Sequence, residues 1–320
     1  MKISIVTTNR DLNQQESLNV KKTSENLKLG LERMFYVVDI FDDLAVALKE
    51  NDKYNFTIVC NAKDAKEFAD IGKKYIFYLH NLKACKVGST PYLESKYAIG
   101  NSIFSIFPSY DWFFVFEELK EKCIYLSNSI SADYKLFSFS RPKINLKDIR
   151  LVYVGQNNEQ GEDELNYILC NEFANKFSLN ITFLSYGCEF FGNVLDEYNF
   201  FDSNNKCNIA CDSWDAEDAI MNHDVLLDFR PKDLASPTYE MLEFMSGGMP
   251  TISSNTNNLR DHKGAISPAE INIPSITSAL QKIIEDWEGY VSSAREFSKR
   301  RSSFDIAKVL DRVLRQFKNG

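Results

Sequence analysis

A carboxylate and two cations in one short stretch are the residues of this sequence whose types and spacing could do chemistry. Arg230 and Lys232 carry positive charge that can hold a phosphate, although solvated loop charges are the alternative, and Glu243 follows a little later in the chain. A carboxylate is poorly placed to bind a phosphate but accepts hydrogen bonds from hydroxyl groups. Glu243 therefore points to a ligand with sugar hydroxyls, and Arg230 and Lys232 place positive charge in the same stretch.

The elements around these residues are expected to form a strand, a loop, a helix and a second strand. A short apolar run has the length of a buried strand, and the loop after it ends in Ser236 and Pro237, which favour a helix cap and the first helical position. Gly247 and Gly248 end the helical pattern, and Pro250 precedes the next strand. The predicted elements are a strand at Val225–Phe229, a loop at Arg230–Ser236, a helix at Thr238–Ser246 and a strand that begins at Thr251–Ser253.

Such an order is one βαβ unit of a parallel sheet. The loop after a strand and the N-terminus of the next helix then face the ligand crevice, where backbone N–H groups and the helix dipole favour an anion. Arg230 and Lys232 lie in that loop, and Glu243 lies in the first turns of the helix, from which it can reach back. The stretch thus predicts a ligand site at the carboxyl edge of the sheet.

The residues from Glu243 to Ile252, EFMSGGMPTI, resemble the E-A-M-A-x-G-x-P-V-V signature of retaining GT-B glycosyltransferases of the family 4 type. The resemblance implies an α/β protein with the GT-B fold: two Rossmann-like doubly wound domains, and a C-terminal helix that crosses back to the first domain. It also implies that Glu243 binds the ribose of a nucleotide-sugar donor. That donor, a UDP- or GDP-sugar for example, is a substrate, and the family needs no cofactor and no metal.

The donor-diphosphate motif of this family is only partly present. After the predicted strand Ile149–Val154 the family carries G-R-x-x-x-x-K-G, whose Arg and Lys hold the diphosphate. Here Gly155 is kept, but Gln156 and Gln160 replace the two cations. A charge-assisted hydrogen bond to phosphate is roughly twice as strong as a neutral one. We therefore expect the two loop cations to supply the positive charge that the glutamines do not.

A further glutamate of many family members, which contacts the transferred sugar, is Ala235 here, and Glu240 or Asp233 would have to substitute for it. The turn at Tyr186 matches a loop that approaches the nucleotide base. Trp214 could stack on a base or pack in the core. On this resemblance the donor-binding residues are Gly155, Gln156, Tyr186, Trp214, Arg230, Lys232, Ser236, Thr238, Glu240 and Glu243.

The N-terminal half alternates expected strands and helices, as in a doubly wound sheet. His80 and Asn81 end a predicted strand on the ligand side of that sheet. With Glu243 they are the candidate catalytic residues, because related glycosyltransferases carry similar residues there that contact the sugar or its diphosphate; a structural role is the alternative for His80. Expected strands are Lys2–Thr7, Tyr36–Ile40, Phe56–Cys60, Tyr75–Leu79 and Trp112–Phe116, and expected helices are Ser17–Met34, Asp42–Lys49, Asp64–Ile71 and Glu117–Lys122.

The second half should repeat this alternation. Asn128 matches an Asn of the family in the segment that leaves the first domain and is expected in a turn. The residues around Phe304 resemble the closing F-S-W-x-x-x-A segment, whose helix returns to the first domain. Expected strands are Ile149–Val154, Ile181–Leu184 and Asn208–Ala210, and expected helices are Glu162–Lys176, Ser275–Asp286 and Gly289–Phe317. The expected domain organisation is an acceptor domain at 1–143, a linker at Arg141–Lys147, a donor domain at 148–288 and a returning tail at 289–320.

Composition limits the classes of function that remain open. The 320 residues are enough for two domains, and a net charge of −8 argues against a general nucleic-acid binder. No apolar run approaches the roughly 20 residues that span a bilayer, and the seven scattered cysteines fit a reducing compartment. We therefore expect a cytoplasmic protein, with peripheral contact at the inner face of the membrane if the lysines at 73, 74, 83, 86 and 96 form a basic face.

Three hypotheses for function remain. The first is a retaining, metal-independent glycosyltransferase that moves a sugar from a nucleotide-diphosphate donor to a glycan or lipid-linked acceptor in surface polysaccharide or glycoconjugate synthesis. The second is a catalytically silent GT-B protein that binds a sugar or a partner enzyme, which the missing cations and Ala235 favour. The third is a GT-B enzyme of different chemistry, an inverting transferase or a sugar-nucleotide epimerase, although three histidines are few for the latter.

Overall fold

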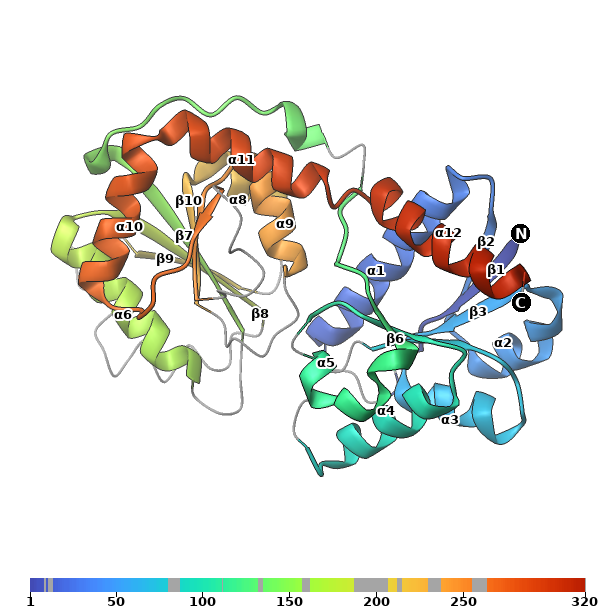
Figure 1. Cartoon of the computed structure of the whole chain (residues 1–320). Coiled ribbons are helices and arrows are strands. Elements are labelled where there is room, and N and C mark those ends of the chain that lie inside the picture. Colours follow the sequence, from blue (N-terminus) through green and yellow to red (C-terminus); the bar gives the residue numbers. More distant parts are fainter. Residues whose placement is uncertain are drawn as a thin grey trace. The chain divides into compact units, whose positions relative to one another are not determined.

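The computed structural model describes residues 1–8, 10, 14–79, 87–110, 112–131, 135–156, 162–186, 207–211, 215–229, 237–254 and 264–319. Contacts divide the chain into two units, each built around its own six-stranded sheet (Figure 1). The first unit comprises Met1–Asp133, Asp233–Tyr239 and Arg301–Gly320, and the second comprises Tyr134–Lys232 and Glu240–Arg300.

All strand pairs of the first sheet are parallel, in the order β2-β1-β3-β4-β5-β6. Its inner strands are short and buried on both faces, because alternate residues such as Ile58 and Val59 pack into two different apolar clusters. The strands are β1 (Lys2–Val6), β2 (Val37–Phe41), β3 (Phe56–Val59), β4 (Ile76–Tyr78), β5 (Ser105–Phe107) and β6 (Cys123–Tyr125).

Helices cover both faces of this sheet. On one face, α1 (Gln14–Glu32) and α12 (Ser303–Asn319) pack against each other and contribute Leu27, Leu31 and Leu310 to one cluster. The other cluster receives α2 (Leu44–Glu50), α3 (Ala62–Asp70), α4 (Thr90–Asn101) and α5 (Trp112–Val115). The first domain is therefore a doubly wound sheet, as the alternating sequence pattern predicted.

One expected strand of this domain was wrong, because residues 112–115 form the helix α5. The exposed fractions show a helical period: Trp112 and Phe116 are buried at 0% and 1%, whereas Phe114 is 80% exposed. The strand that lies next to β4 in the sheet is instead β5, which follows α4 in the chain. The sequence analysis predicted neither β5 nor α4. A short apolar run such as WFFVF does not distinguish a strand from a buried helix by its period alone.

The second sheet is also parallel, in the order β12-β11-β10-β7-β8-β9. Its strands are β7 (Arg150–Gln156), β8 (Asn180–Tyr186), β9 (Cys207–Cys211), β10 (Val225–Asp228), β11 (Thr251–Ser253) and β12 (Ala265–Ile266). Its helices are α6 (Glu162–Phe177), α8 (Ala216–Asn222), α9 (Tyr239–Ser246), α10 (Ile273–Glu285) and α11 (Trp287–Lys299).

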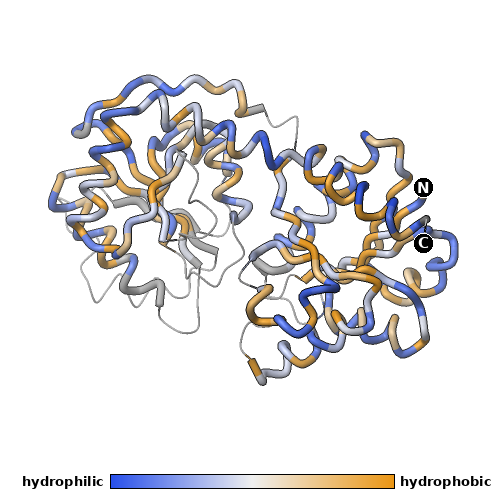
Figure 2. The backbone as a smooth tube through the Cα atoms, viewed as in Figure 1, coloured by the Kyte–Doolittle hydropathy of each residue, from blue (hydrophilic) through white to orange (hydrophobic). Residues whose placement is uncertain are grey.

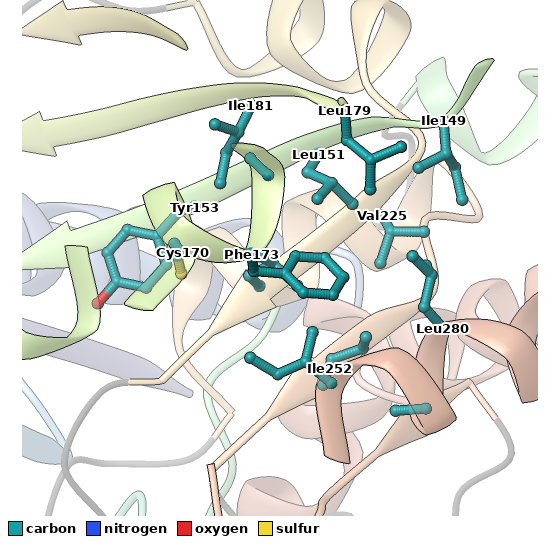
Figure 3. Packing of buried hydrophobic residues seen from close by; sticks show 14 of the residues in the cluster. Ile149, Leu151, Tyr153, Cys170, Phe173, Leu179, Ile181, Val225, Ile252 and Leu280 are labelled. Atoms are coloured by element: carbon teal, nitrogen blue, oxygen red, sulfur yellow. The ribbon is translucent and has the colours of Figure 1, made fainter. Parts of the chain in front are cut away.

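The core of the second domain lies between this sheet and the helices α6, α10 and α11. Figure 3 shows alternate residues of β7, Leu151 and Tyr153, facing Phe173 of α6, with Leu280 of α10 beside Ile252 and Val225. Hydropathy follows the same layout within each unit, with apolar residues concentrated along the strands and mixed polarity along the helices (Figure 2). Among the described residues no helix is long and apolar enough to cross a membrane.

The tail contains three helices, α10, α11 and α12, where the sequence analysis expected two. The second expected helix is interrupted at residues 300–302, because the backbone there pairs with Ile130 instead of continuing the helix. Ile130 N–H donates to Arg301 O at 3.0 Å, and Ser303 N–H donates to Ile130 O at 2.7 Å. Ser302 Oγ then accepts from Asp305 N–H at 3.2 Å, at the start of α12. The break separates α11 of the second unit from α12 of the first.

Arg141, at the start of the expected linker, fastens that segment to the second domain. Its guanidinium donates to Gly247 O at 2.8 Å and to the carbonyls of His223 and Ile220 at 2.5 Å. Burial lowers the pKa of Arg141 to about 10. Because these carbonyls lie at the C-terminal ends of α8 and α9, one buried cation satisfies acceptors that both helices leave open.

Candidate functional site

The second sheet changes direction at β7, which makes its carboxyl edge the natural ligand crevice. β7 pairs with β8 on one side, from which the sheet continues to β9, and with β10 on the other, from which it continues to β11 and β12. Loops at such a topological switch point diverge and leave room for a ligand. The candidate site is therefore built from the ends of β7, β8 and β10 and from the helix α9 that follows β10.

Register places three predicted donor-binding residues together at this edge. Gly155 and Gln156 are the last residues of β7. Gln156 lies opposite Tyr186, the last residue of β8, and Gly155 lies opposite Ser185. The ends of β7 and β8 thus bring the backbone of the expected diphosphate loop next to that of the expected base loop.

Helix α9 begins at Tyr239, two residues later than Pro237, so the expectation that Pro237 occupies the first helical position was wrong. The carbonyl of Pro237 accepts a hydrogen bond from Asn128 Nδ2 at 2.9 Å, and the hydroxyls of Tyr239 and Thr23 are hydrogen-bonded. These contacts hold residues 237–239 in the first unit. Thr238, half-buried, immediately precedes the helix.

The two candidate carboxylates lie three residues apart on α9 and so share one side of the helix. Glu240 is in the first turn and only 1% exposed, and Glu243 is half-buried one turn later. The N–H groups of a first helical turn favour negative charge. Carboxylates at this position can accept hydrogen bonds from ligand hydroxyls, whereas a phosphate would be repelled from Glu243 and must approach from the β7 side.

The far end of α9 is held firmly, which fixes the position of both carboxylates. Gly248 adopts φ +75°, and Met249 N–H returns to Phe244 O at 3.2 Å, so the helix ends at the glycine pair as expected. Ser298 Oγ donates to Leu242 O at 2.8 Å. A Cβ on Gly248 would lie 2.9 Å from Val291 Cγ1, so the glycine also permits close packing on α11.

Two further polar residues at this edge were not singled out from the sequence. Asp228 ends β10 and is 5% exposed. Asn166 of α6 donates from Nδ2 to Phe229 O at 3.2 Å and ties α6 to the end of the same strand. Asp228 could have been proposed as a site residue from the sequence, because it lies near the end of the predicted strand Val225–Phe229. No local sequence feature indicates that Asn166 lies at this edge.

Several predicted site residues lie outside the described part of the chain. These are His80, Asn81, Trp214, Arg230, Lys232 and Ser236, together with Gln160, Asp233 and Ala235.

His223 is the only histidine within the described residues, and its place is structural. Its Nδ1 lies 2.8 Å from Ala219 O, a pure acceptor, so Nδ1 carries the proton and Nε2 accepts from Thr182 Oγ1 at 2.8 Å. Burial lowers the pKa of His223. The residue precedes β10, at the amino edge of the sheet, on the side away from the candidate site.

Two parallel doubly wound domains of this kind define the chain as a protein with the GT-B fold, and solved structures match it along nearly its whole length. The Anabaena protein HepE, in complex with UDP and glucose, has a TM-score of 0.70 and 12% identity over 99% of this chain and 100% of that one. The catalytic domain of starch synthase IV from Arabidopsis thaliana, bound to ADP and acarbose, has a TM-score of 0.66 and 10% identity, covering 98% of each chain.

An α-glucosyltransferase in complex with UDP and a mismatched 13-mer DNA also matches, with a TM-score of 0.66 and 13% identity over 98% of this chain and 99% of that one. At such identities the likeness establishes the fold. No protein-family model and no curated protein sequence matches the chain.

Proposed function

We propose that this protein is a glycosyltransferase that moves a sugar from a nucleotide-diphosphate donor to a glycan or lipid-linked acceptor, with retention of configuration and without a metal ion. The observation that carries the proposal is the pair Glu240 and Glu243 on α9, beside the switch point at the end of β7. The matching structures that hold UDP with glucose, or ADP with acarbose, support a nucleotide-sugar donor.

In this proposal each part of the donor meets a different part of the second domain. The ribose hydroxyls donate to Glu243, and Tyr186 and Trp214 lie toward the base. The diphosphate lies at the end of β7, where the N–H groups after Gly155 and the side chain of Gln156 can donate to it. Its negative charge is balanced by Arg230 and Lys232 of the β10–α9 loop, and Ser236 and Thr238 donate from the same loop.

The chemistry requires charge to be stabilised on the departing diphosphate, which preorganised N–H groups and cations supply. The acceptor oxygen bonds to the anomeric carbon on the face from which the diphosphate leaves, and the hydroxyl proton passes to the departing diphosphate oxygen, so no protein nucleophile is needed. His80 and Asn81 contact the transferred sugar, and Glu240 takes the place of the glutamate that Ala235 replaces. Its burial at 1% is consistent with a carboxylate held in one orientation.

Peripheral contact with the inner face of a membrane, the last part of this proposal, does not rest on the lysines of the first domain. Lys73 and Lys96 already pair with Asp52 and Glu118, and lysines 83 and 86 lie outside the described residues. The support for membrane contact comes from exposed apolar side chains on α4, on α5 and in the turn before α4. Their exposed fractions are 69% for Val87, 57% for Leu93 and 80% for Phe114.

A catalytically silent GT-B protein is the second candidate. It is favoured by one specific observation, the neutral Gln156 at the end of β7 where a cation would hold the diphosphate. Such a protein would bind a sugar or a partner enzyme and would not cleave a donor sugar.

Calorimetry with UDP, GDP, ADP and CMP, followed by hydrolysis assays with the matching sugar nucleotides, tests the proposal. A hydrogen bond to a charged group contributes about 1.5–3 kcal/mol, so Glu243→Gln should weaken nucleotide binding about 10- to 100-fold. Glu288→Gln, an exposed glutamate of α11 in the same domain, is the matched control and should bind like the wild type.

The outcomes separate the two candidates. Nucleotide binding that depends on Glu243 together with release of free sugar supports the transferase. Binding without any sugar release, with or without added acceptors, favours the silent protein. If none of the four nucleotides binds the wild type, the transferase is rejected, and the silent protein with a sugar or a partner enzyme as its ligand is the candidate that is left.

A further inference from the structure

The first sheet has a switch point of its own, which the proposed donor site does not use. β1 pairs with β2 on one side and with β3 on the other, and the sheet then continues from β3 to β6. Ligands of doubly wound sheets bind at the carboxyl ends of such strands. Here those ends carry Thr8 and Arg10 after β1, and Asn61 and Asp64 after β3.

Side chains from α3 hold the residues after β1 in place. Thr8 Oγ1 donates to Asp64 Oδ2 at 2.5 Å, and Asn61 Nδ2 donates to Arg10 O at 2.8 Å. The guanidinium of Arg10 donates from Nη1 to Glu67 Oε1 at 2.5 Å. Asn61 also caps α3, accepting from Lys63 N–H at 2.9 Å. Arg10 is therefore positioned at both its backbone and its guanidinium.

Asp64 is the unusual member of this group. It is 0% exposed, and burial raises the pKa of its carboxyl. Thr8 satisfies Oδ2, but Oδ1 has no hydrogen-bond partner among the described residues; the nearest cation, Arg10 Nη1, is 3.8 Å away. Buried carboxylate oxygens are rarely left without a donor, because the cost is of the order of 1–3 kcal/mol. A role in fastening the loop to α3 needs only Oδ2, so it leaves Oδ1 unexplained.

We propose that Arg10, Asp64 and Glu67 form the acceptor subsite and bind neighbouring hydroxyls of a neutral saccharide; this inference rests on the proposed function. Sugar hydroxyls both donate and accept, so one hydroxyl can accept from Arg10 while its neighbour donates to Glu67. Asp64 is 0% exposed, so a ligand hydroxyl can supply the donor that Oδ1 lacks only by entering beside Arg10, whose Nη1 lies 3.8 Å from that oxygen. The Arg10 and Glu67 side chains are 49% and 47% exposed, so a ligand can reach them.

Charge decides the class of acceptor. One guanidinium and two carboxylates sum to −1, and Arg10 is already paired with Glu67 and near Asp64. A phosphate or uronate would meet two carboxylates whose charge the one guanidinium does not fully balance, whereas a neutral saccharide meets no such repulsion. The acceptor subsite thus selects against anionic sugars.

Saturation-transfer NMR and calorimetry on the full chain saturated with UDP test this assignment. The probes are the methyl α-glycosides of glucose, galactose and mannose, against glucose 6-phosphate and glucuronate. At least one neutral glycoside should bind the wild type more tightly than either anion. Arg10→Gln and Glu67→Gln should weaken neutral binding about tenfold, and Glu67→Gln, which makes the group neutral, should improve glucose 6-phosphate relative to the glycosides.

Lys96→Gln breaks an exposed ion pair with Glu118 elsewhere in the same domain and should change nothing. Tighter binding of an anion by the wild type, no binding of any neutral glycoside, or neutral binding that is unchanged in both Arg10→Gln and Glu67→Gln would each overturn the inference. UDP affinity is measured on every variant. If none of UDP, GDP, ADP and CMP binds the wild type, the proposed function has failed. Intact binding of UDP, or of whichever of these nucleotides binds and is used in its place, together with any of those results rejects the acceptor subsite alone.

Discussion

The pKa values of two buried aspartates of the first domain shift in opposite directions, because their neighbours differ. Burial raises the pKa of Asp64, and a single hydroxyl, Thr8, donates to it. Burial would also raise the pKa of Asp311, but hydrogen bonds from Arg315 and Tyr36 and the charge of Arg315 outweigh it, so this pKa lies below its ordinary value. Arg315 Nε donates to both carboxylate oxygens of Asp311 at 2.8 Å.

Asp311 should therefore stabilise the first domain at neutral pH and less so in acid. A carboxyl whose pKa is lowered on folding contributes stability above its unfolded pKa and loses it as pH falls through the folded pKa. Asp311→Asn should lower the free energy of unfolding by about 1–3 kcal/mol at pH 7. The difference from wild type should shrink below the ordinary aspartate value of 3.8.

Urea unfolding from pH 7 to pH 3 measures this dependence. Asp42→Asn, an exposed aspartate of the same domain, is the control and should track the wild type. A deficit of Asp311→Asn that stays constant across this range would show that the carboxyl acts through shape and not through charge.

How far single residues could be interpreted from the sequence depended on whether their partners are local. The position of Glu243 on a helix could be predicted because the helix, the glycine pair that ends it and the following strand are contiguous in the sequence. Asp64 was not, because its partner Thr8 lies 56 residues away and the two meet only where β1 and β3 pair. Asp228 lay between these cases, since a strand end can be predicted locally but a switch point needs the strand order.

At the scale of elements, the packing of α12 on α1 depends on a glycine. A Cβ on Gly30 would lie 2.8 Å from Ala307 Cβ and closer still to the carbonyl of Ser303. Gly100, within α4, is also a helical glycine, but a Cβ there would meet no atom of the described residues within 4 Å. The two glycines therefore separate the effect of helix propensity from that of helix packing.

Gly30→Ala should destabilise the protein by about 1–3 kcal/mol, as overpacking does, even though alanine favours helices. Gly100→Ala should stabilise it by about 0.5–1 kcal/mol, because it gains the same propensity without a clash. Thermal unfolding followed by circular dichroism compares the two variants. Equal stabilisation of both would mean that α12 does not approach α1 as closely as Gly30 permits.

Helices and strands could be predicted from the sequence where the spacing of apolar residues and the polar or glycine residues at the ends of the run indicate the same bounds. Without that agreement they could not. β1, β10 and α9 have clear apolar runs bounded by polar or glycine residues, and their positions were predicted to within two residues. The run at Trp112 has no distinguishing period until its burial is known. The break before α12 carries no glycine or proline and arises from pairing with Ile130, a contact between distant parts of the chain.

At the scale of the whole molecule, the two units have separate cores. Clusters around β1 and β3 involve only residues of the first unit, and the cluster around β7 and β10 only residues of the second. A ligand stabilises the structure that binds it through mass action, so its effect should appear mainly in the unit that contributes the contacts. The proposed donor site thus predicts an asymmetric response to nucleotide.

Hydrogen exchange with mass spectrometry measures that asymmetry. Saturating UDP, or whichever nucleotide binds, should slow exchange in peptides from β7, β10 and α9, while peptides from β1, β3 and α3 should exchange as in the free protein. Glu243→Gln at the same nucleotide concentration should lose most of the added protection, and Glu288→Gln should keep it. Protection that appears first in the β1 and β3 peptides would place the nucleotide at the switch point of the first sheet, and both the donor site and the acceptor subsite would then have to be reassigned.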